Sequence, residues 1–167
     1  MNRLMFFILL LFSNIIISAQ EKLSYEDLSK TSKEIGEKYF ASYLAMDWDK
    51  IETMLADNAT FTDPTAETVF GGGLRDGKEA MMKSFREGYA SIEELKFIKS
   101  RTIFSGNYAI FEGDLDWTVR VGNGKKVSTV MPIITMLKIE NRKVTEHRDF
   151  ADYHPFLVEF GKARNAE

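Results

Sequence analysis

A long stretch of alternating apolar and polar residues, Ala109 to Val121, most constrains what this chain can fold into. Successive side chains of a β-strand point to opposite faces of a sheet, so this strand has one apolar face and one wet face. Gly122-Asn123-Gly124 follows it with the residues that a hairpin turn requires. The next stretch, Lys126 to Ile139, is apolar on both faces, which is typical of a central strand. The sequence therefore predicts a long antiparallel sheet.

Two further stretches complete a four-strand meander. One is Phe97 to Phe104, and the other follows the turn at Glu140-Asn141-Arg142. A short strand, Ala59 to Thr62, stops at Asp63-Pro64, because proline has no N–H with which to continue a ladder. The segment after this proline, which includes Gly71-Gly72-Gly73, is expected to be a loop.

The part of the chain before the sheet has the pattern of helices. Apolar residues recur at sevens, fours and threes from Tyr25 to about Met46, which predicts a long amphipathic helix. Asp47 is placed to cap a second, short helix, and Asp76 with Glu79 forms a capping box for a third. Helices followed by hairpinned strands indicate an α+β fold. We expect three N-terminal helices on the concave face of a curved antiparallel sheet of about four long strands plus one short strand.

The composition excludes several classes of protein. The chain has 167 residues, of which 44% are hydrophobic and 28% charged, so we expect a single globular domain with one core. A net charge of -3 argues against nucleic acid or an anionic membrane surface as a partner. The absence of cysteine from the sequence excludes a disulfide framework, a thiol nucleophile and a thiolate metal site.

Residues 1–19 have the pattern of a secretory signal peptide. Arg3 supplies the positive end, Met5 to Ile17 the apolar segment, and Ser18-Ala19 a cleavage site of small residues. The apolar segment is short for a membrane-spanning helix, and an uncleaved membrane anchor is the alternative to a cleaved signal. We therefore expect an exported protein, periplasmic or secreted, with no stable membrane insertion after cleavage and with residues 20–167 as its one domain.

The stretch from Glu140 to Phe156 contains both histidines of the chain within an expected strand. Alternation places His147, Asp149 and Tyr153 on one side of this strand. One interpretation is a polar row that lines a cavity. The alternative is an edge strand with solvated charges and one hydrogen-bonded histidine.

The segments KYFASYLAMDWDKIETMLADNATFTDP, DGKEAMMKSF and EHRDFADYHPF, in this order, resemble the SnoaL-like branch of the nuclear transport factor two-like superfamily. The resemblance covers nearly all of the chain after residue 19. It implies a bent sheet wrapped around a long helix, which gives a cone-shaped barrel with a deep pocket. Because that superfamily contains both enzymes and binding proteins, the fold alone does not set the function.

Ketosteroid isomerases of this superfamily use a tyrosine in the first helix, a protonated acid on a late strand and an aspartate before a proline. Tyr39 and Asp63 match the first and the last of these. The late-strand position falls on the apolar Ile134, so half of the oxyanion hole is missing. The resemblance therefore disfavours steroid isomerisation.

Limonene-epoxide hydrolases of the same superfamily are similar to the chain at Arg148-Asp149-Phe150, where Asp149 matches their general acid. Their partner arginine and aspartate would fall near Asp114 and Asp116, where the chain has no arginine and both side chains are expected to point outward. The resemblance implies a pocket acid and not epoxide opening.

Six residues are expected on the wall of the cavity: Tyr39, Asp63, Trp117, His147, Asp149 and Tyr153. The first hypothesis is an exported protein that binds a small, largely apolar molecule, with Tyr39, Trp117 and Tyr153 as ligand-binding residues. The second is an acid–base isomerase, hydrolase or cyclase with Asp63, His147 and Asp149 as its catalytic groups, since an aspartate beside a histidine in an apolar cavity can transfer protons. Each residue also has a structural alternative, such as a turn cap for Asp63 and core packing for Tyr39 and Trp117. No cofactor is expected.

One histidine and one aspartate on a strand face are fewer than the three protein ligands of a metal site, so no metal is predicted. The outer face of the central strand presents Val130, Ile134 and Met136. Such a patch predicts a homodimer through the sheet. It also supports a third hypothesis, a protein-interaction domain that acts through its sheet surface.

Overall fold

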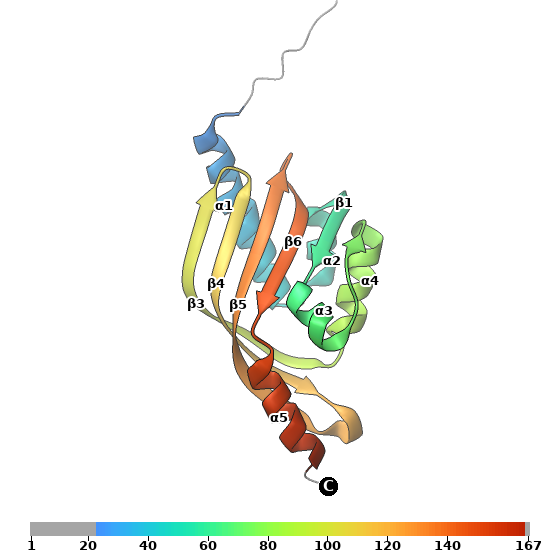
Figure 1. Cartoon of the computed structure of the whole chain (residues 1–167). Helices are drawn as coiled ribbons and strands as arrows, with labels where there is room; N and C mark the ends of the chain where they lie inside the picture. Colours follow the sequence, from blue (N-terminus) through green and yellow to red (C-terminus); the bar gives the residue numbers. More distant parts are fainter. Residues whose placement is uncertain (1–22, 166–167) are drawn as a thin grey trace, which may run out of the picture.

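The structure, a computed structural model of the chain, describes residues 23–165. In that part the chain forms five α-helices and six β-strands (Figure 1). The helices are α1 (Tyr25–Leu44), α2 (Trp48–Met54), α3 (Pro64–Phe70), α4 (Lys78–Gly88) and α5 (His154–Asn165). The strands are β1 (Leu55–Thr62), β2 (Arg75–Asp76), β3 (Ile92–Ser105), β4 (Tyr108–Arg120), β5 (Lys126–Glu140) and β6 (Lys143–Ala151). The predicted signal peptide, residues 1–19, lies outside the described residues.

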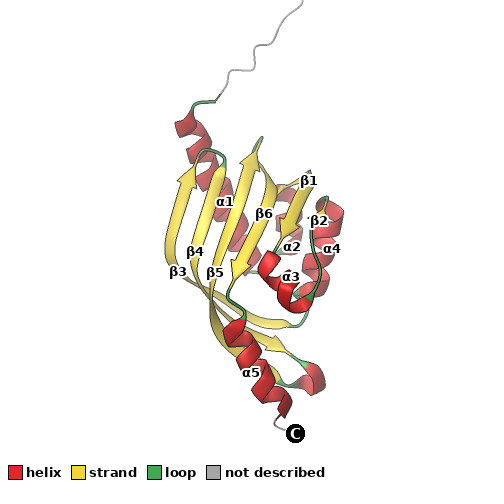
Figure 2. Cartoon of the chain, viewed as in Figure 1, coloured by secondary structure: helices red, strands yellow, loops and turns green. Residues whose placement is uncertain are grey.

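All six strands belong to one sheet, in the order β2-β1-β6-β5-β4-β3 (Figure 2). Strands β3 to β6 pair antiparallel as a meander, whereas β1 pairs parallel with β6. The predicted four-strand meander and the α+β class are therefore confirmed. The sheet has two short strands beyond the meander instead of one, because β2 pairs with β1. The prediction of three N-terminal helices is wrong, since the described part has five helices.

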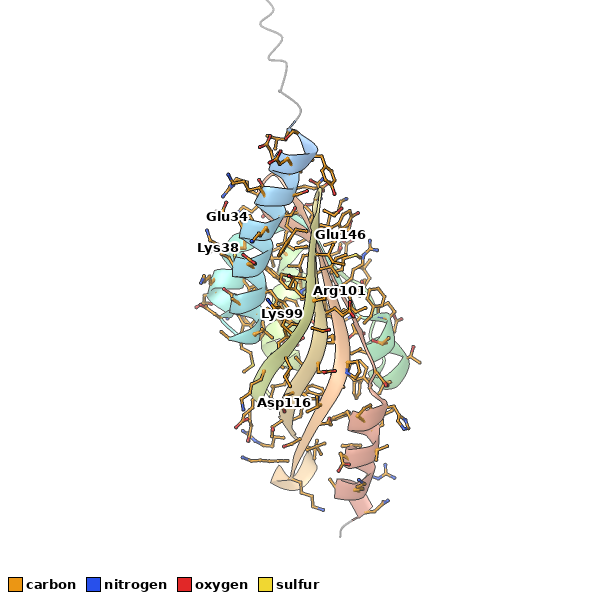
Figure 3. All side chains as sticks on the ribbon, turned by 90° about the vertical axis from the view of Figure 1, so that its left-hand side faces the viewer. Glu34, Lys38, Lys99, Arg101, Asp116 and Glu146 are labelled. Atoms are coloured by element: carbon orange, nitrogen blue, oxygen red, sulfur yellow. The ribbon has the colours of Figure 1, made fainter. Side chains whose placement is uncertain are left out.

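Burial alternates along β4, as the period of its sequence predicted, and it also alternates along β5, whose sequence is apolar on both faces. On β5 the inward row includes the buried Met131 and Thr135, and the outward row includes the exposed Val130 and Ile134. Figure 3, turned from the first view, shows the side chain of Arg101 on the side of the sheet away from α1. The core therefore lies on one face of the sheet, between the strands and α1.

The long helix α1 packs closely on the inner face of the sheet. Its buried residues include Tyr39 and Tyr43, one turn apart on the side that faces the strands. At Gly36 a Cβ atom would lie 2.5 Å from the Cβ of Ala109 on β4. The glycine therefore permits the approach of helix to strand that brings both tyrosines against β6.

The segment after Asp63 is the helix α3 and not the predicted loop. Asp63 is its N-cap and accepts a hydrogen bond from the backbone N–H of Ala66, and Pro64 stands at the first helical position. Both residues are known helix-start signals, so the sequence contained the evidence for α3. The predicted capping box at Asp76 is wrong, because Gly77 is the N-cap of α4 and makes no side-chain cap hydrogen bond.

The helix α5, which was also not predicted, follows β6 closely. Strand β6 pairs with Ile133–Glu140 of β5, so the first half of β5 has no β6 residue beside it. Helix α5 packs against this half of β5 (Figure 1), where Phe156 joins Val119 and Val127 in a buried cluster. The rings of Phe156 and Phe70 of α3 lie with centroids 5.7 Å apart, so the two helices meet at the same end of the sheet.

Within residues 23–165, none of the helices combines the length and the apolar character needed to cross a membrane.

Candidate functional site

A cavity of about 380 Å³ lies between the inner face of the sheet and helices α3, α4 and α5. Its aromatic lining consists of Tyr43, Phe61, Phe70, Tyr89, Trp117, Tyr153 and Phe156. Aliphatic side chains of β3, β4 and β5 complete most of the wall. Among the lining residues, Asp63 and Asp149 carry the charged groups. An aromatic cavity of this size with a few convergent polar groups is typical of a small-molecule site.

Asp149 reaches the cavity from the inner face of β6 and accepts three hydrogen bonds. Its Oδ1 accepts from the hydroxyl of Thr135 at 2.6 Å and from Nε2 of His147 at 3.1 Å. Its Oδ2 accepts from the hydroxyl of Tyr43 at 3.1 Å. Each carboxylate oxygen has two acceptor positions. Among the described residues, Tyr43 alone donates to Oδ2, so one acceptor position of this oxygen is unused.

His147 lies behind Asp149, in the fully buried layer between β6 and α1. Its Nδ1 is 3.1 Å from the hydroxyl of Tyr39, and its Nε2 is 3.1 Å from Oδ1 of Asp149. A neutral imidazole with its proton on Nε2 satisfies both contacts, because Tyr39 then donates to Nδ1 and His147 donates to Asp149. A protonated imidazole would leave the buried Tyr39 hydroxyl without an acceptor among the described residues. The network therefore assigns the neutral Nε2–H tautomer to His147.

Asp63 faces the same cavity from the N-terminus of α3. Its Oδ1 accepts from the hydroxyl of Thr65 at 2.5 Å and from the N–H of Ala66 at 2.7 Å. Its Oδ2 accepts from the hydroxyl of Tyr153 at 2.7 Å. Asp63 thus repeats the arrangement of Asp149, with two donors on one oxygen and one tyrosine on the other. Asp63 is therefore both the N-cap of α3 and a residue of the cavity wall.

Two tyrosines of α1 stay protonated beside Asp149. Burial, and then the negative charge of Asp149, raises the pKa of the Tyr39 phenol well above its usual value. The same two causes, in the same order, raise the pKa of the Tyr43 phenol. Both hydroxyls therefore act as hydrogen-bond donors at neutral pH, Tyr39 toward His147 and Tyr43 toward Asp149.

Two further tyrosines, Tyr89 and Tyr153, lie on the wall of the cavity with the aspartates. Burial and then the charge of Asp149 raise the pKa of Tyr89, with a smaller contribution from Asp63. Burial and then the charge of Asp63 raise the pKa of Tyr153, with a smaller contribution from Asp149. Both carboxylates and both phenols line the same cavity. The Tyr89 hydroxyl also hydrogen-bonds that of Tyr43, whose own proton goes to Asp149, so Tyr89 is the donor. We call Tyr39, Tyr43, Tyr89 and Tyr153 the site tyrosines.

Four of the six predicted site residues line the cavity, namely Asp63, Trp117, Asp149 and Tyr153. His147 and Tyr39 do not line it, and both are completely buried in the layer behind. The placement of Tyr39 on the wall, as a ligand-binding residue, is therefore corrected. Tyr43, one helical turn later, occupies the wall in its place.

Sequence reasoning missed several residues of the site. Thr135 was missed although the outward positions of Val130, Ile134 and Met136 imply that it points inward, because its contact with Asp149 depends on the register of β5 with β6. Phe70 and Phe156 were missed with the helices that carry them. The Nε1 of Trp117, on the cavity wall, is buried and has no hydrogen-bond partner among the described residues.

The structure also tests the residue matches to the two enzyme groups. Ile134 is 41% exposed on the outer face, so its match to the late-strand acid of the isomerases is wrong. The neighbouring inward residue is Thr135, which contacts Asp149. Asp116 lies opposite the exposed Val130, which confirms the outward direction predicted for it. Within residues 23–165, no group of three or more histidine and acidic side chains is placed to hold a metal ion.

A model of the SnoaL-like domain family matches residues 37–147, more than half of the chain. The chain therefore belongs to the SnoaL-like domain family, within the nuclear transport factor two-like superfamily. This confirms the resemblance found in the sequence. Asp149 and Tyr153 lie just beyond the matched residues. No curated protein is significantly similar to the chain in sequence.

Solved structures share the fold at low sequence identity. A candidate SnoaL-like polyketide cyclase from Shewanella denitrificans OS-217 has a TM-score of 0.70 and 16% identity, with 78% of this chain and 97% of that chain covered. A second candidate cyclase, from Shewanella putrefaciens CN-32, has a TM-score of 0.69 and 20% identity, with coverage of 78% and 96%. A protein of ketosteroid isomerase-like fold from Catenulispora acidiphila DSM 44928, in complex with trimethylamine, has a TM-score of 0.61 and 17% identity, with coverage of 78% and 94%.

Proposed function

We propose that this SnoaL-like protein binds a small, largely apolar molecule in the cavity between the sheet and helices α3, α4 and α5. The observation that carries the proposal is the aromatic cavity of about 380 Å³, into which Asp63 and Asp149 both face. Aromatic walls supply apolar contact area, and the two carboxylates orient a bound molecule. The Catenulispora protein, whose fold is similar, is in complex with trimethylamine, which supports the binding of a small molecule by this fold.

A thermal-shift screen of the chain from Gln20 tests this function, with steroids, polyketide-like aromatics, terpenoid epoxides and fatty acids as the panel. A ligand present at a hundred times its dissociation constant adds about 2.7 kcal/mol to the stability of the folded state. The screen is repeated with Asp149→Asn and, as a control on the outer face, with Asp116→Asn. The proposal predicts a hit that the first variant weakens and the second leaves unchanged. A panel without any hit would count against the cavity as the working site.

A second candidate function is acid–base catalysis, as an isomerase, hydrolase or cyclase. The observation that favours it is the hydrogen-bonded series from Tyr39 through His147 to Asp149, which ends at the cavity. In this reaction Asp149 takes a proton from the bound substrate, and Asp63 is the second carboxylate on the same wall. Product formation that wild type supports and Asp149→Asn lacks, with ligand affinity retained in the variant, would establish catalysis in place of binding alone.

We also propose a homodimer through the outer face of the sheet and export by the signal peptide at residues 1–19. Val130 is 49% exposed, and Ile134 and Phe150, neighbours on adjacent strands, are 41% and 40% exposed. Exposed apolar side chains in register form a self-complementary surface when two sheets stack. Sedimentation of wild type and of Ile134→Glu tests the dimer, with a monomeric wild type as the contrary result. N-terminal sequencing of the mature protein tests cleavage after Ala19.

A further inference from the structure

We propose that the ligand of the cavity is an organic amine, protonated at neutral pH and attached to an apolar body. This inference rests on the proposed small-molecule function and narrows its ligand class. It follows from three properties of the cavity wall: unused hydrogen-bond acceptors, uncompensated negative charge and aromatic rings beside each carboxylate.

The polar groups of the wall are mainly acceptors. Oδ2 of Asp149 and Oδ2 of Asp63 each receive one tyrosine hydroxyl and keep a second acceptor position. The protons of Tyr43 and Tyr153 are directed to these carboxylates, so neither hydroxyl is left as a donor for a ligand. Tyr89 likewise directs its proton to Tyr43. A ligand that pairs these carboxylate oxygens must donate hydrogen bonds, whereas the buried Nε1–H of Trp117 is one donor on the same wall without a partner among the described residues.

The charge on the wall is negative and has no cationic side chain to balance it. Asp63 and Asp149 line the cavity, and no lysine or arginine is among the lining residues. His147, the one basic side chain in hydrogen-bond contact with Asp149 in the described part of the chain, is in the neutral form that its contact with Tyr39 assigns. A positive charge on the ligand therefore has two carboxylates to pair with in a partly desolvated site, where Coulomb attraction is stronger than in water.

Aromatic rings stand beside both carboxylates. The ring of Tyr153, which bonds Asp63, lies 5.2 Å from that of Phe70 and 6.4 Å from that of Trp117. The ring of Tyr43, which bonds Asp149, lies 5.6 Å from that of Tyr89. The negative faces of such rings attract a cation, most strongly where water is excluded.

The cavity rings are not already used by a cation of the protein. In the described part of the chain, the cation–π contact found is that of Lys33 with Phe104, and neither residue lines the cavity. A neutral ligand without a donor group, such as the hydrocarbon isostere of an amine, would cover the unused acceptors of both aspartates without pairing them, which is unfavourable. An anionic ligand would be repelled by both. The wall therefore favours a protonated amine over its uncharged isostere.

Three probes with a common benzyl group test this order of affinity by calorimetry on the mature protein at neutral pH. They are protonated N,N-dimethylbenzylamine, its uncharged isostere isobutylbenzene, and the anion phenylacetate. We expect the amine to bind at least about tenfold more tightly than isobutylbenzene. Phenylacetate is expected to bind most weakly.

Variants locate the source of the preference. Asp63→Asn and Asp149→Asn keep the side-chain volume. Each is expected to lower the affinity for the amine by about tenfold and to change the affinity for isobutylbenzene by less than about twofold. Asp116→Asn on the outer face is expected to change neither. Far-UV circular dichroism checks folding, and if a variant unfolds, the ranking of the three probes on wild type still decides.

The outcomes separate the two proposals. If isobutylbenzene or phenylacetate binds as tightly as the amine, the inferred charge of the ligand is wrong, while the cavity remains a small-molecule site. If none of the three probes binds and the wider ligand panel also gives no hit, the proposed function fails and this inference fails with it.

Discussion

The substitution Tyr39→Phe removes one hydroxyl from the buried layer behind the cavity and keeps the ring in place. The Tyr39 side chain has no exposed area, and its hydroxyl is 3.1 Å from Nδ1 of His147. Without the hydroxyl, this nitrogen becomes a buried acceptor that no described residue can pair. Leaving a buried acceptor unpaired destabilises a protein by about 1–3 kcal/mol. We expect a loss of this size in the free energy of unfolding.

Urea unfolding measures the loss, and Tyr25→Phe is the matched control. Tyr25 is 67% exposed, and its hydroxyl is 2.8 Å from Oγ of Ser105. The same atom is removed, but water replaces the contact, so the change should stay within about 0.5 kcal/mol. In thermal unfolding, each kcal/mol corresponds to about 2–4 °C for a domain of this size.

Two further measurements distinguish this network from general core packing. Nitrogen NMR of wild type should show His147 as the neutral Nε2–H tautomer, and ligand affinity should change little in Tyr39→Phe because Tyr39 does not line the cavity. The reasoning is refuted if Tyr39→Phe is no less stable than Tyr25→Phe. A wild-type His147 that carries its proton on Nδ1 would refute the assigned direction of the hydrogen bonds.

Three other predictions concern stability. Gly36→Ala should destabilise the protein by about 1–3 kcal/mol in urea unfolding, because its Cβ would lie 2.5 Å from that of Ala109. Gly161→Ala in α5 is the control, because a Cβ there meets no atom within 4 Å, and it should instead stabilise the protein by about 0.5–1 kcal/mol. If the two variants change the free energy of unfolding equally, the close packing of α1 on β4 is contradicted. Thr135→Val removes the 2.6 Å hydrogen bond to Asp149 and should lower the free energy of unfolding by about 1.5–3 kcal/mol, so an unchanged urea midpoint would exclude that bond. The folded-state pKa values of the site tyrosines lie above those of the unfolded chain, because burial and the nearby carboxylates disfavour the phenolate. Their contribution to the free energy of unfolding is therefore fully present below about pH 10. Above that pH it falls by about 1.4 kcal/mol per pH unit for each tyrosine. Phenolate absorbance that rises for these four phenols before unfolding would contradict their burial.

Much of the fold could be predicted because strand and helix periods are local properties. The alternation along β4 identified its inner and outer faces, and the alternation along β6 placed His147 and Asp149 together. The turn at Asn141-Arg142 was predicted from its residues, and both have positive φ in the structure. The family resemblance, carried by these local patterns, was confirmed by the family match.

The helix α3 could not be predicted from local sequence patterns alone. Asp63-Pro64 was interpreted as the end of a strand, although the same pair is an N-cap and a first helical residue. The sequence supported both interpretations, since a proline that ends one element can begin the next. The choice depended on whether α3 could pack against β6, which is a tertiary contact.

The sequence by itself determined the class of the fold, the two faces of the sheet and the candidate residues Asp63, Trp117, Asp149 and Tyr153. The tertiary structure alone decided which tyrosine of α1 reaches the cavity. Tyr39 and Tyr43 are one turn apart on one helix face, and the depth of each depends on how closely Gly36 lets the helix approach the sheet. The tertiary structure also decided that Asp63 and Asp149 face one cavity. These residues are 86 positions apart and meet only through the parallel pairing of β1 with β6. Local patterns set the direction of a side chain, whereas long-range pairing sets what it meets.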